Sequence, residues 1–235
     1  MPMSSTVRAA LADALDVLFP AWCAGCDEPG GPLCPDCRIA LTPDIRRRTL
    51  AGGLEVVSAL AFDGVAARAL RACKEDGRTS LARPLGHALG AAVSAALGPF
   101  RDQDDARVAI VPVPTSRAAM RRRGYAVTGL LVRGAGLSAT RLLVPARAGD
   151  DQRTLGREER ARNVRGTLRA RPAGGRTVVI VDDVVTTGAT LAEAARVLRE
   201  AGAQVVAAAT VAATPLRRGL PANAGTDAAT HETHT

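Results

Sequence analysis

Four short apolar runs alternate along this chain with stretches of helical periodicity, and this order constrains the fold more than any other feature. The expected strands are 54–62, 107–114, 177–183 and 204–212, and the expected helices are 64–77, 80–97, 125–136 and 189–202. Strands that alternate with helices in this way form βαβ units. The sequence therefore predicts an α/β fold with a central, mostly parallel sheet and helices on both faces.

The chain of 235 residues is long enough for one main domain with a small appendage. Its composition is 47% hydrophobic but only 2% aromatic, so the core must be built from Ala, Val and Leu. No run approaches the roughly 18 apolar residues that cross a bilayer. Residues 1–20 predict an amphipathic helix that ends at Pro20, and Asp13 and Asp16 interrupt its apolar run. We therefore expect no signal peptide, no membrane insertion and a cytoplasmic protein.

The net charge is +8, with 31 Lys and Arg residues against 23 Asp and Glu residues. This balance favours an anionic partner, such as a phosphorylated metabolite, a nucleic acid or a membrane surface. Arginine supplies almost all of the positive charge and Lys74 is the only lysine. Such usage is typical of nucleotide-composition bias as well as of a basic binding face, so the charge leaves the kind of partner open.

Four of the five cysteines lie close together, as Cys23, Cys26, Cys34 and Cys37, with the spacing C-x2-C-x7-C-x2-C. Each C-x2-C pair can place two thiolates on one side of a tight turn, and four thiolates suit tetrahedral Zn²⁺. A pair of disulfides or a redox dithiol is the alternative, but adjacent disulfides require an oxidising compartment. The spacing therefore predicts a closed, structural zinc module. Cys73 stands apart and is expected to be a small buried residue.

The stretch 178–191, "VVIVDDVVTTGATL", places Asp182 and Asp183 at the end of an expected strand. In open parallel sheets, ligands bind beyond the carboxyl ends of the strands. The backbone N–H groups and hydroxyls of 186–190, together with the helix that follows, form an anion site without a lysine. Two carboxylates beside a phosphate are useful when they accept hydrogen bonds from vicinal hydroxyls. The expected ligand is therefore a sugar phosphate.

Other nucleotide-binding loops do not fit this sequence. The P-loop pattern G-x4-G-K-[ST] is absent, and no G-x-G-x-x-G follows an expected strand. An ordinary strand-turn-helix connection is the remaining alternative.

The stretch 178–191 resembles the motif with which type I phosphoribosyltransferases bind phosphoribosyl pyrophosphate (PRPP). The chain also resembles the ComF family within that group, in which a four-cysteine module precedes such a domain, and the matching pieces span roughly 18–212. The resemblance implies a type I phosphoribosyltransferase-like fold. The PRPP-binding residues that it implies in this stretch are Asp182, Asp183, Thr186, Thr187, Gly188, Ala189 and Thr190.

A second matching stretch is 110–125, "IVPVPTSRAAMRRRGY". A strand that ends in prolines leads into a stiff turn with two hydroxyls and an arginine, which can hold an anion. The resemblance implies that this turn is the pyrophosphate loop and that Thr115, Ser116 and Arg117 bind there. The arginine cluster 121–123 is either a solvated face or directed at phosphate.

A third matching stretch, 151–168, corresponds to a flexible loop that closes over the active site in related transferases. The matching positions are Gln152, Leu155, Arg160, Asn163, Val164 and Gly166. Lys74 resembles the family's lysine-then-glycine turn, a match that chance explains equally well. This chain departs from the family at 124–127, which reads Gly-Tyr-Ala-Val where many members have Gly-Phe-Asn-Gln, and at Phe62, where tyrosine is common.

The resemblance implies that 5-phosphoribose passes from PRPP to a nitrogenous acceptor in nucleoside metabolism, with Mg²⁺ bridging the pyrophosphate and the ribose hydroxyls. Asp182, Asp183 and Arg117 are then the expected catalytic residues. Two alternatives stay open: a non-catalytic PRPP- or nucleotide-binding protein, and a protein that handles single-stranded DNA beside competence proteins during DNA uptake. The acceptor and homo-oligomerisation also stay open. The expected domains are 1–50 with the N-terminal helix and zinc module, 51–216 with the transferase-like fold, and a disordered tail at 217–235.

Overall fold

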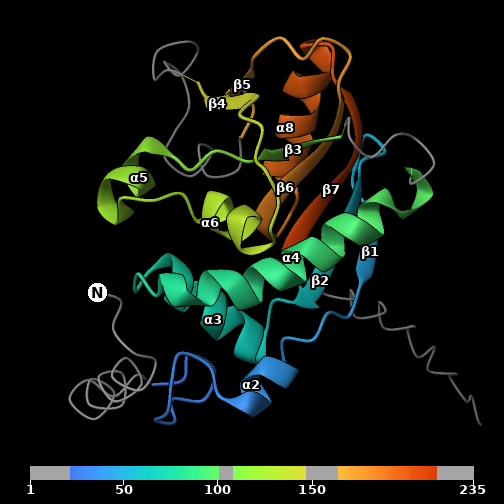
Figure 1. Cartoon of the computed structure of the whole chain (residues 1–235). Coiled ribbons are helices and arrows are strands. Elements are labelled where there is room, and N and C mark those ends of the chain that lie inside the picture. The colour runs from blue at the N-terminus through green and yellow to red at the C-terminus, as the bar shows by residue number, and fades with distance from the viewer. Residues whose placement is uncertain (1–21, 101–107, 147–163, 216–235) are drawn as a thin grey trace, which may run out of the picture.

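The computed structural model describes residues 22–100, 108–146 and 164–215, and its centre is a five-stranded sheet (Figure 1). The strand order is β1-β2-β7-β6-β3. The strands are β1 (Arg46–Thr49), β2 (Glu55–Ala61), β3 (Ala109–Pro112), β6 (Thr177–Val185) and β7 (Gln204–Ala213). All neighbouring pairs are parallel except β1 and β2. The predicted fold class, a mostly parallel sheet between helices, is confirmed.

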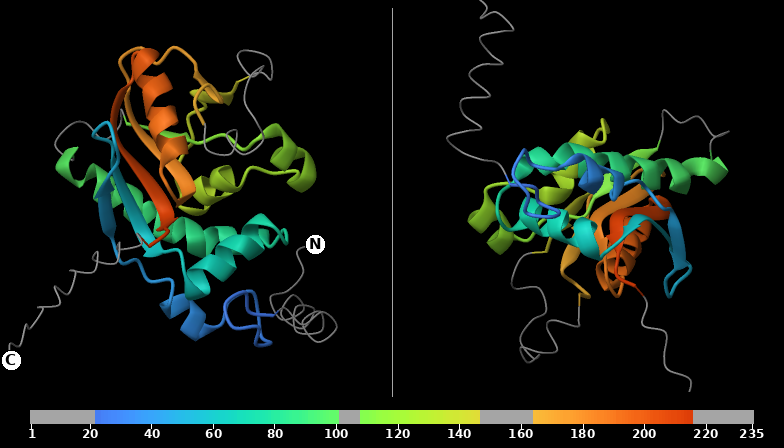
Figure 2. Two further views of the ribbon diagram at one scale, coloured as in Figure 1. Left: turned by 180° about the vertical axis from the view of Figure 1, so that it is seen from behind. Right: turned by 90° about the horizontal axis from the view of Figure 1, so that it is seen from below.

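Helices cover both faces of this sheet (Figures 1 and 2). Along β6, Val179 and Val181 belong to the core on the side of α4 (Ala82–Leu97) and α6 (Val127–Gly134). Val178 and Ile180 point the other way, into the core beneath α8 (Ala189–Glu200). This alternation follows from the two-residue period of a strand. Because both faces of β6 are covered, its consecutive residues Val178–Val181 are all apolar.

Small residues let the helices of this aromatic-poor core approach closely. A Cβ on Gly134 of α6 would lie 2.1 Å from the carbonyl oxygen of Ala82 in α4, and a Cβ on Gly86 would lie 2.5 Å from the Gly134 backbone. The two helices therefore pack backbone against backbone at this crossing, as glycine allows.

Several short elements escape the sequence pattern. They are the strand β1, the hairpin of β4 (Leu143–Pro145) and β5 (Leu168–Ala170), and the helices α2 (Pro35–Ile39) and α5 (Arg117–Arg123). The 3₁₀ turns η1 (Thr79–Leu81) and η2 (Gly98–Phe100) flank α4. The strand β1 reads Arg-Arg-Arg-Thr and has no apolar period, so only its pairing with β2 makes it a strand.

The cysteine module, residues 22–41, packs against α3 (Gly64–Lys74) near Val65 in its first turn. Cys37, Leu33 and Leu41 belong to the same apolar core as the helices on that face. Arg78, just after α3, donates hydrogen bonds to the carbonyl oxygens of Trp22 and Pro32. The expected domain boundary near residue 50 falls between the paired strands β1 and β2.

Some expectations lie outside the described residues. These are the N-terminal helix of 1–20, the loop positions Gln152, Leu155, Arg160 and Asn163, and the tail 217–235. Within the described ranges, no helix combines the length and the apolar character that a bilayer span requires.

Candidate functional site

The acidic pair, Asp182 and Asp183, lies near the carboxyl end of β6, an inner strand of the sheet. The strand runs two residues past the pair, to Val185, where the sequence suggested an end at Asp183. Backbone N–H groups hold both side chains: Asp183 N–H donates to Asp182 Oδ1 at 2.8 Å, and Val184 N–H donates to Asp183 Oδ1 at 2.8 Å. The pair is therefore fixed before any ligand arrives.

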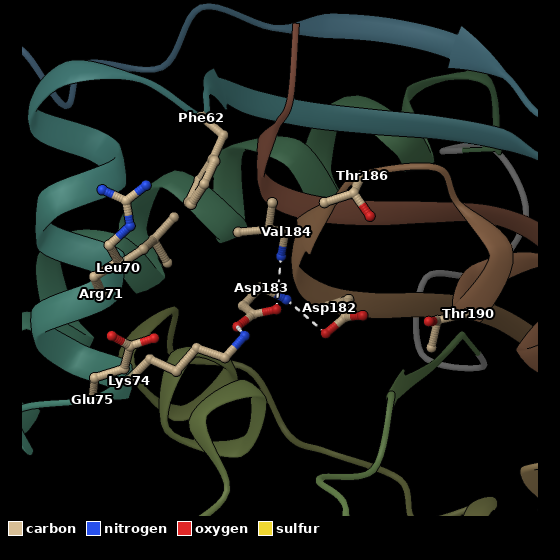
Figure 3. A pocket seen from close by; sticks show the side chains of 10 residues that line it. All are labelled: Phe62, Leu70, Arg71, Lys74, Glu75, Asp182, Asp183, Val184, Thr186 and Thr190. Atoms are coloured by element: carbon tan, nitrogen blue, oxygen red, sulfur yellow. Dashed lines mark hydrogen bonds and ion pairs between the residues drawn. The ribbon is translucent and has the colours of Figure 1, made fainter. Parts of the chain in front are cut away.

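Lys74, at the end of α3, forms an ion pair with this acidic pair (Figure 3). Its Nζ lies 2.7 Å from Asp183 Oδ2, and the side chains of Lys74 and Asp183 are 38% and 11% exposed. Tyr125 holds the end of the same helix, because its hydroxyl donates to the Cys73 carbonyl oxygen at 2.7 Å. Cys73 itself is fully buried, which confirms its expected place in the core. Lys74 therefore contacts the acidic pair, and its correspondence to the family's lysine stays a prediction.

Lys74 pairs with Asp183, and no other residue that the structure describes forms an ion pair with Asp182. Burial and the neighbouring Asp183 carboxylate raise the pKa of Asp182 well above its usual range. The Thr128 hydroxyl reaches Asp182 Oδ1 at 3.5 Å, the outer limit of a hydrogen bond. A ligand that donates hydrogen bonds to this carboxylate relieves an unfavourable arrangement.

Replacing Asp182 by Asn should therefore stabilise the ligand-free protein, and more so at higher pH. In the folded protein Asp182 stays protonated above pH 3.8, the ordinary pKa of an aspartate, whereas in the unfolded chain it loses its proton there. Wild-type stability therefore falls as pH rises from 3.8 to the raised pKa of Asp182. Asn has no such titration and still accepts the Asp183 N–H. Thermal melting of both proteins should show a gap that is small near pH 4 and wider at pH 8. A gap that stays constant or narrows would contradict this prediction.

Residues 186–190, which the sequence predicts to bind phosphate and which are called the phosphate loop below, follow β6 and lead into α8. Gly188 is the N-cap of α8 and has φ +85°, a left-handed conformation that glycine adopts without strain. A Cβ there would lie 2.5 Å from Leu50 Cδ1, so the position is closed to other side chains. The Thr187 hydroxyl accepts the Ala189 N–H at 3.3 Å. The loop thus presents backbone N–H groups and the N-terminus of a 12-residue helix, as anion sites do.

Two cavities meet at the acidic pair. The first, of about 380 Å³, lies between α3, the end of β2 and the phosphate loop (Figure 3). Its lining consists of Phe62, Leu70, Arg71, Lys74, Glu75, Asp182, Asp183, Val184, Thr186 and Thr190. The second, of about 350 Å³, lies between β6 and the start of α5. Its lining consists of Lys74, Val113, Pro114, Thr115, Ser116, Ala119, Arg122, Arg123, Val127, Thr128, Asp182 and Asp183.

The second cavity brings together residues that the sequence placed in a pyrophosphate loop. Thr115 and Ser116 line it, and the Ser116 hydroxyl also caps α5 by accepting the Ala119 N–H at 3.2 Å. Arg122 and Arg123 line it too, whereas Arg117 does not belong to the lining of either cavity. Two of the clustered arginines therefore face the site through the turn of α5, and the proposed role of Arg117 stays a prediction.

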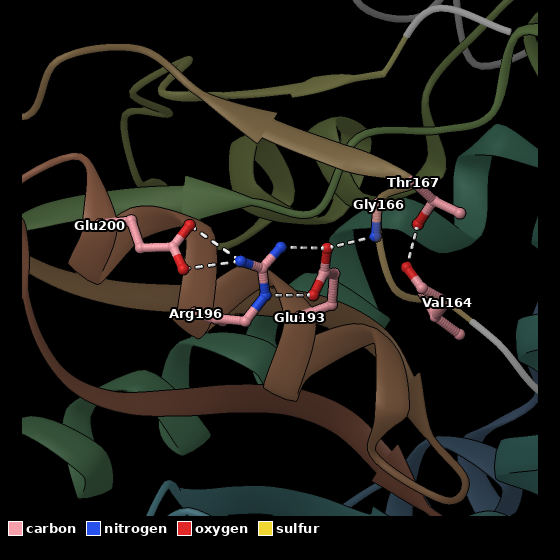
Figure 4. Close-up of polar contacts among 6 residues, drawn as sticks. All are labelled: Val164, Gly166, Thr167, Glu193, Arg196 and Glu200. Atoms are coloured by element: carbon pink, nitrogen blue, oxygen red, sulfur yellow. Dashed lines mark hydrogen bonds and ion pairs between the residues drawn. The ribbon is translucent and has the colours of Figure 1, made fainter. Parts of the chain in front are cut away.

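A buried carboxylate on α8 anchors the chain on the other side of the phosphate loop (Figure 4). Glu193 is 5% exposed, accepts the Gly166 N–H at 2.7 Å and pairs with Arg196. The Arg196 hydrogen bonds lower the pKa of Glu193 in spite of its burial. Arg196 also reaches Glu200 at 2.7 Å. This network ties the backbone at Gly166 to the helix that begins at the phosphate loop.

The four clustered cysteines have the geometry of a metal site. Their sulfur atoms all lie within 4.8 Å of one another, and Cys26 Sγ and Cys34 Sγ are 3.7 Å apart. Four sulfurs around Zn²⁺ at about 2.3 Å in a tetrahedron would be about 3.8 Å apart. All five cysteines of the chain, each within the described ranges, are free thiols. The donor set thus fits one zinc ion.

The backbone of the cysteine module prepares Cys23 to be a thiolate. Burial acts against its charge, but N–H groups of Cys34, Gly25 and Cys26 outweigh burial and lower the Cys23 pKa to about 6. Gly25 and Cys34 donate to the sulfur at 3.3 Å each. In contrast, burial raises the pKa of Cys37. The Cys37 sulfur therefore gains most from a cation at the centre of the four.

Comparison with known proteins agrees with this geometry. The family described as phosphoribosyl transferase domain matches residues 135–226. Adenine phosphoribosyltransferases of Mycobacterium avium and Nocardia farcinica are each 65% identical over 37 residues, 16% of this chain and 21% and 19% of theirs. The chain thus spans about a fifth of the length of the curated relatives it matches.

Solved structures show weaker likeness. An adenine phosphoribosyltransferase has 15% identity and a TM-score of 0.37 over 75% of this chain and 89% of its own. The glutamine PRPP amidotransferase of B. subtilis has 22% identity and a TM-score of 0.33 over 55% of this chain and 26% of its own. The family match is the finding that matters: residues 135–226, which include the acidic pair and the loop after it, are similar to a phosphoribosyl transferase domain.

Proposed function

We propose that this protein binds PRPP and transfers its 5-phosphoribosyl group to a nitrogenous acceptor. The observation that carries the proposal is the meeting of two cavities at Asp182 and Asp183. The 5′-phosphate occupies the phosphate loop, and the ribose hydroxyls donate hydrogen bonds to the two carboxylates. The pyrophosphate lies in the second cavity, against Thr115, Ser116 and the arginines of α5.

The two cavities suit a displacement at C1′ of the ribose. The acceptor nitrogen must approach from the side opposite the leaving group, and the first cavity offers that side. The nitrogen lone pair forms the new N–C1′ bond, the C1′–O bond breaks, and its electron pair leaves with the pyrophosphate. A proton on the acceptor nitrogen then passes to water or to the departing pyrophosphate. The protein contributes position and charge, and this mechanism needs no side chain as a base.

At its outer edge the first cavity has a surface for a flat acceptor. The Arg71 guanidinium lies 5.5 Å from the centre of the Phe62 ring, and Glu75, the residue that follows the last residue of α3, lines the same cavity. A planar ring can stack on such a pair, while the carboxylate accepts hydrogen bonds from ring or amino N–H groups. We expect a nitrogen heterocycle as the acceptor.

Both metals suit the residues that would receive them. Carboxylate oxygens of the acidic pair are ligands of the kind that Mg²⁺ prefers, and Mg²⁺ bound with PRPP would neutralise charge on the leaving pyrophosphate. The four cysteine sulfurs, which line neither cavity, would hold a structural Zn²⁺ that takes no part in the transfer.

We place the protein in the ComF type of phosphoribosyltransferase, because a four-cysteine module precedes the domain in the chain. A role in natural competence belongs to this proposal. The same site supports a regulator that binds PRPP without transfer. Single-stranded DNA is less favoured, because two of the clustered arginines line the second cavity rather than an open face.

A melting and turnover experiment tests the proposal. PRPP with Mg²⁺ at about 100 times its dissociation constant should stabilise the fold by about 2.7 kcal/mol. Pyrophosphate release should then be followed with a panel of purine and pyrimidine bases. No shift with PRPP would sink the proposal. A shift without turnover would leave the regulator, and a base that releases pyrophosphate would identify the acceptor.

A further inference from the structure

The strand β1 carries three consecutive arginines, and only the third turns toward the site. Arg46 pairs with Asp44 at 2.8 Å. Arg47 pairs with Glu55 and donates to the Ala95 carbonyl oxygen at 2.7 Å. Arg48 Nη2 donates to the carbonyl oxygen of Thr186, 138 residues away, at 2.8 Å. One arginine of β1 therefore touches the backbone of the phosphate loop.

Arg48 is held in a poor environment for a cation. Its Nε is shielded from solvent and has no hydrogen-bond partner, and it is the one buried side-chain nitrogen or oxygen with that property among the described residues. Burial also lowers the pKa of Arg48. An arginine on a strand edge can turn into water and avoid both penalties. That it stays against the loop indicates a role there.

The bond to Thr186 fixes one face of the phosphate loop. In a planar trans peptide the carbonyl and the following N–H point in opposite directions. When Arg48 holds the Thr186 carbonyl oxygen, the Thr187 N–H points away from β1. Leu50, at the end of the same strand, packs against Gly188 and closes that side of the loop. The Thr187 N–H is thus left to face the opposite side, where an anion can enter.

We propose that Arg48 is a positioning residue that orients the phosphate loop for the 5′-phosphate of its ligand. The proposal rests on the proposed PRPP site. Arg48 acts through the Thr186–Thr187 peptide: it fixes the direction of the N–H donor, and its charge polarises the carbonyl so that this N–H becomes a stronger donor. It makes no contact with the acidic pair or with the second cavity.

The test compares Arg48→Met with Arg47→Met, its neighbour on the same strand, which also donates to a backbone carbonyl oxygen. The probes are ribose 5-phosphate, which needs the phosphate loop, and inorganic pyrophosphate, which needs the second cavity. Arg48→Met should weaken ribose 5-phosphate and PRPP by about tenfold. It should leave pyrophosphate binding unchanged. Arg47→Met should change none of these affinities, and Arg48→Lys should restore part of the loss.

Equal weakening of both probes, or no weakening at all, would overturn the proposal. Failure of the wild type to bind PRPP is a separate result, because it removes the proposed function. In that case hydrogen–deuterium exchange of 186–192 in the ligand-free proteins decides the role of Arg48. Faster exchange in Arg48→Met than in Arg47→Met supports the role, and equal exchange refutes it.

Discussion

Replacing Cys34 by serine is expected to remove the bound zinc and to lower the melting temperature by about 10 °C, the equivalent of about 3 kcal/mol for a domain of this size. The four sulfurs lie within 4.8 Å of one another, so without a cation their charges repel or their thiols must be protonated. The loss should spread beyond the cysteine module, because Cys37, Leu33 and Leu41 share one core with the helices. Metal analysis and calorimetry measure the two effects.

Cys73→Ala is the matched control, because it removes a thiol that lies outside the four-cysteine cluster. It should keep one zinc ion per chain and lose only the stability of a small core change. Adding a chelator to the wild type should reproduce the Cys34→Ser melting curve. A Cys34→Ser protein that still carries one zinc ion per chain would refute the four-sulfur site. Two disulfides in the wild-type protein would also refute it and would establish the disulfide alternative.

The metal should also matter to the site at a distance. A Cβ on Gly25 of the cysteine module would lie 2.9 Å from the Val65 side chain, which shows how closely the module meets α3. The same helix ends at Lys74, which pairs with Asp183. If the module loosens, the helix that carries Lys74 loses its support, and PRPP should bind more weakly to the zinc-free protein.

Replacing Asp183 by Asn is expected to weaken PRPP binding by about 100-fold while changing stability little. The carboxylate is the proposed acceptor for a ribose hydroxyl, and an amide presents only one oxygen with no charge. On the folded protein the change is mild, because Lys74 is 38% exposed and can turn into water when its partner is lost. Isothermal titration and thermal melting separate the two quantities.

Lys74→Met provides the contrast. It leaves the Asp183 carboxylate, 11% exposed, beside Asp182 with no cation, which should lower stability by about 1.5–3 kcal/mol. Asp183→Asn should therefore lose the ligand and keep the fold, whereas Lys74→Met should lose stability first. If both variants lose stability and neither loses PRPP affinity beyond that effect, the ion pair is structural and the ribose lies elsewhere.

The predicted core elements are largely confirmed because each has a period of its own. The apolar runs around Val179 and Ala208 are buried on both faces, and α4 and α8 carry the periodicity of helices. The short elements were missed for a physical reason. Arg46–Thr49 is a strand only because β2 offers a free edge, and nothing in its residues marks it.

The candidate site divides in the same way. Asp182, Asp183 and the threonines of the phosphate loop lie within nine residues, so their proximity follows from the sequence, and their proposed roles rest on that spacing together with the family resemblance. That Arg122 and Arg123 line the second cavity follows only from the structure of α5, because the sequence leaves their direction open. Arg48 gave no signal, since it is one of three identical neighbours and only its contact with Thr186 sets it apart.

By itself the sequence determined the features that local spacing controls. The two thiols of each C-x2-C pair, and the two carboxylates before a glycine-threonine loop, remain neighbours in almost any fold, because only a few residues separate them. Only the tertiary structure decided which remote groups meet them. Lys74 reaches Asp183 across 109 residues and Arg48 reaches Thr186 across 138, and both contacts depend on the order and direction of strands in the sheet. That order arises from packing the whole core, and no single stretch of the chain contains it.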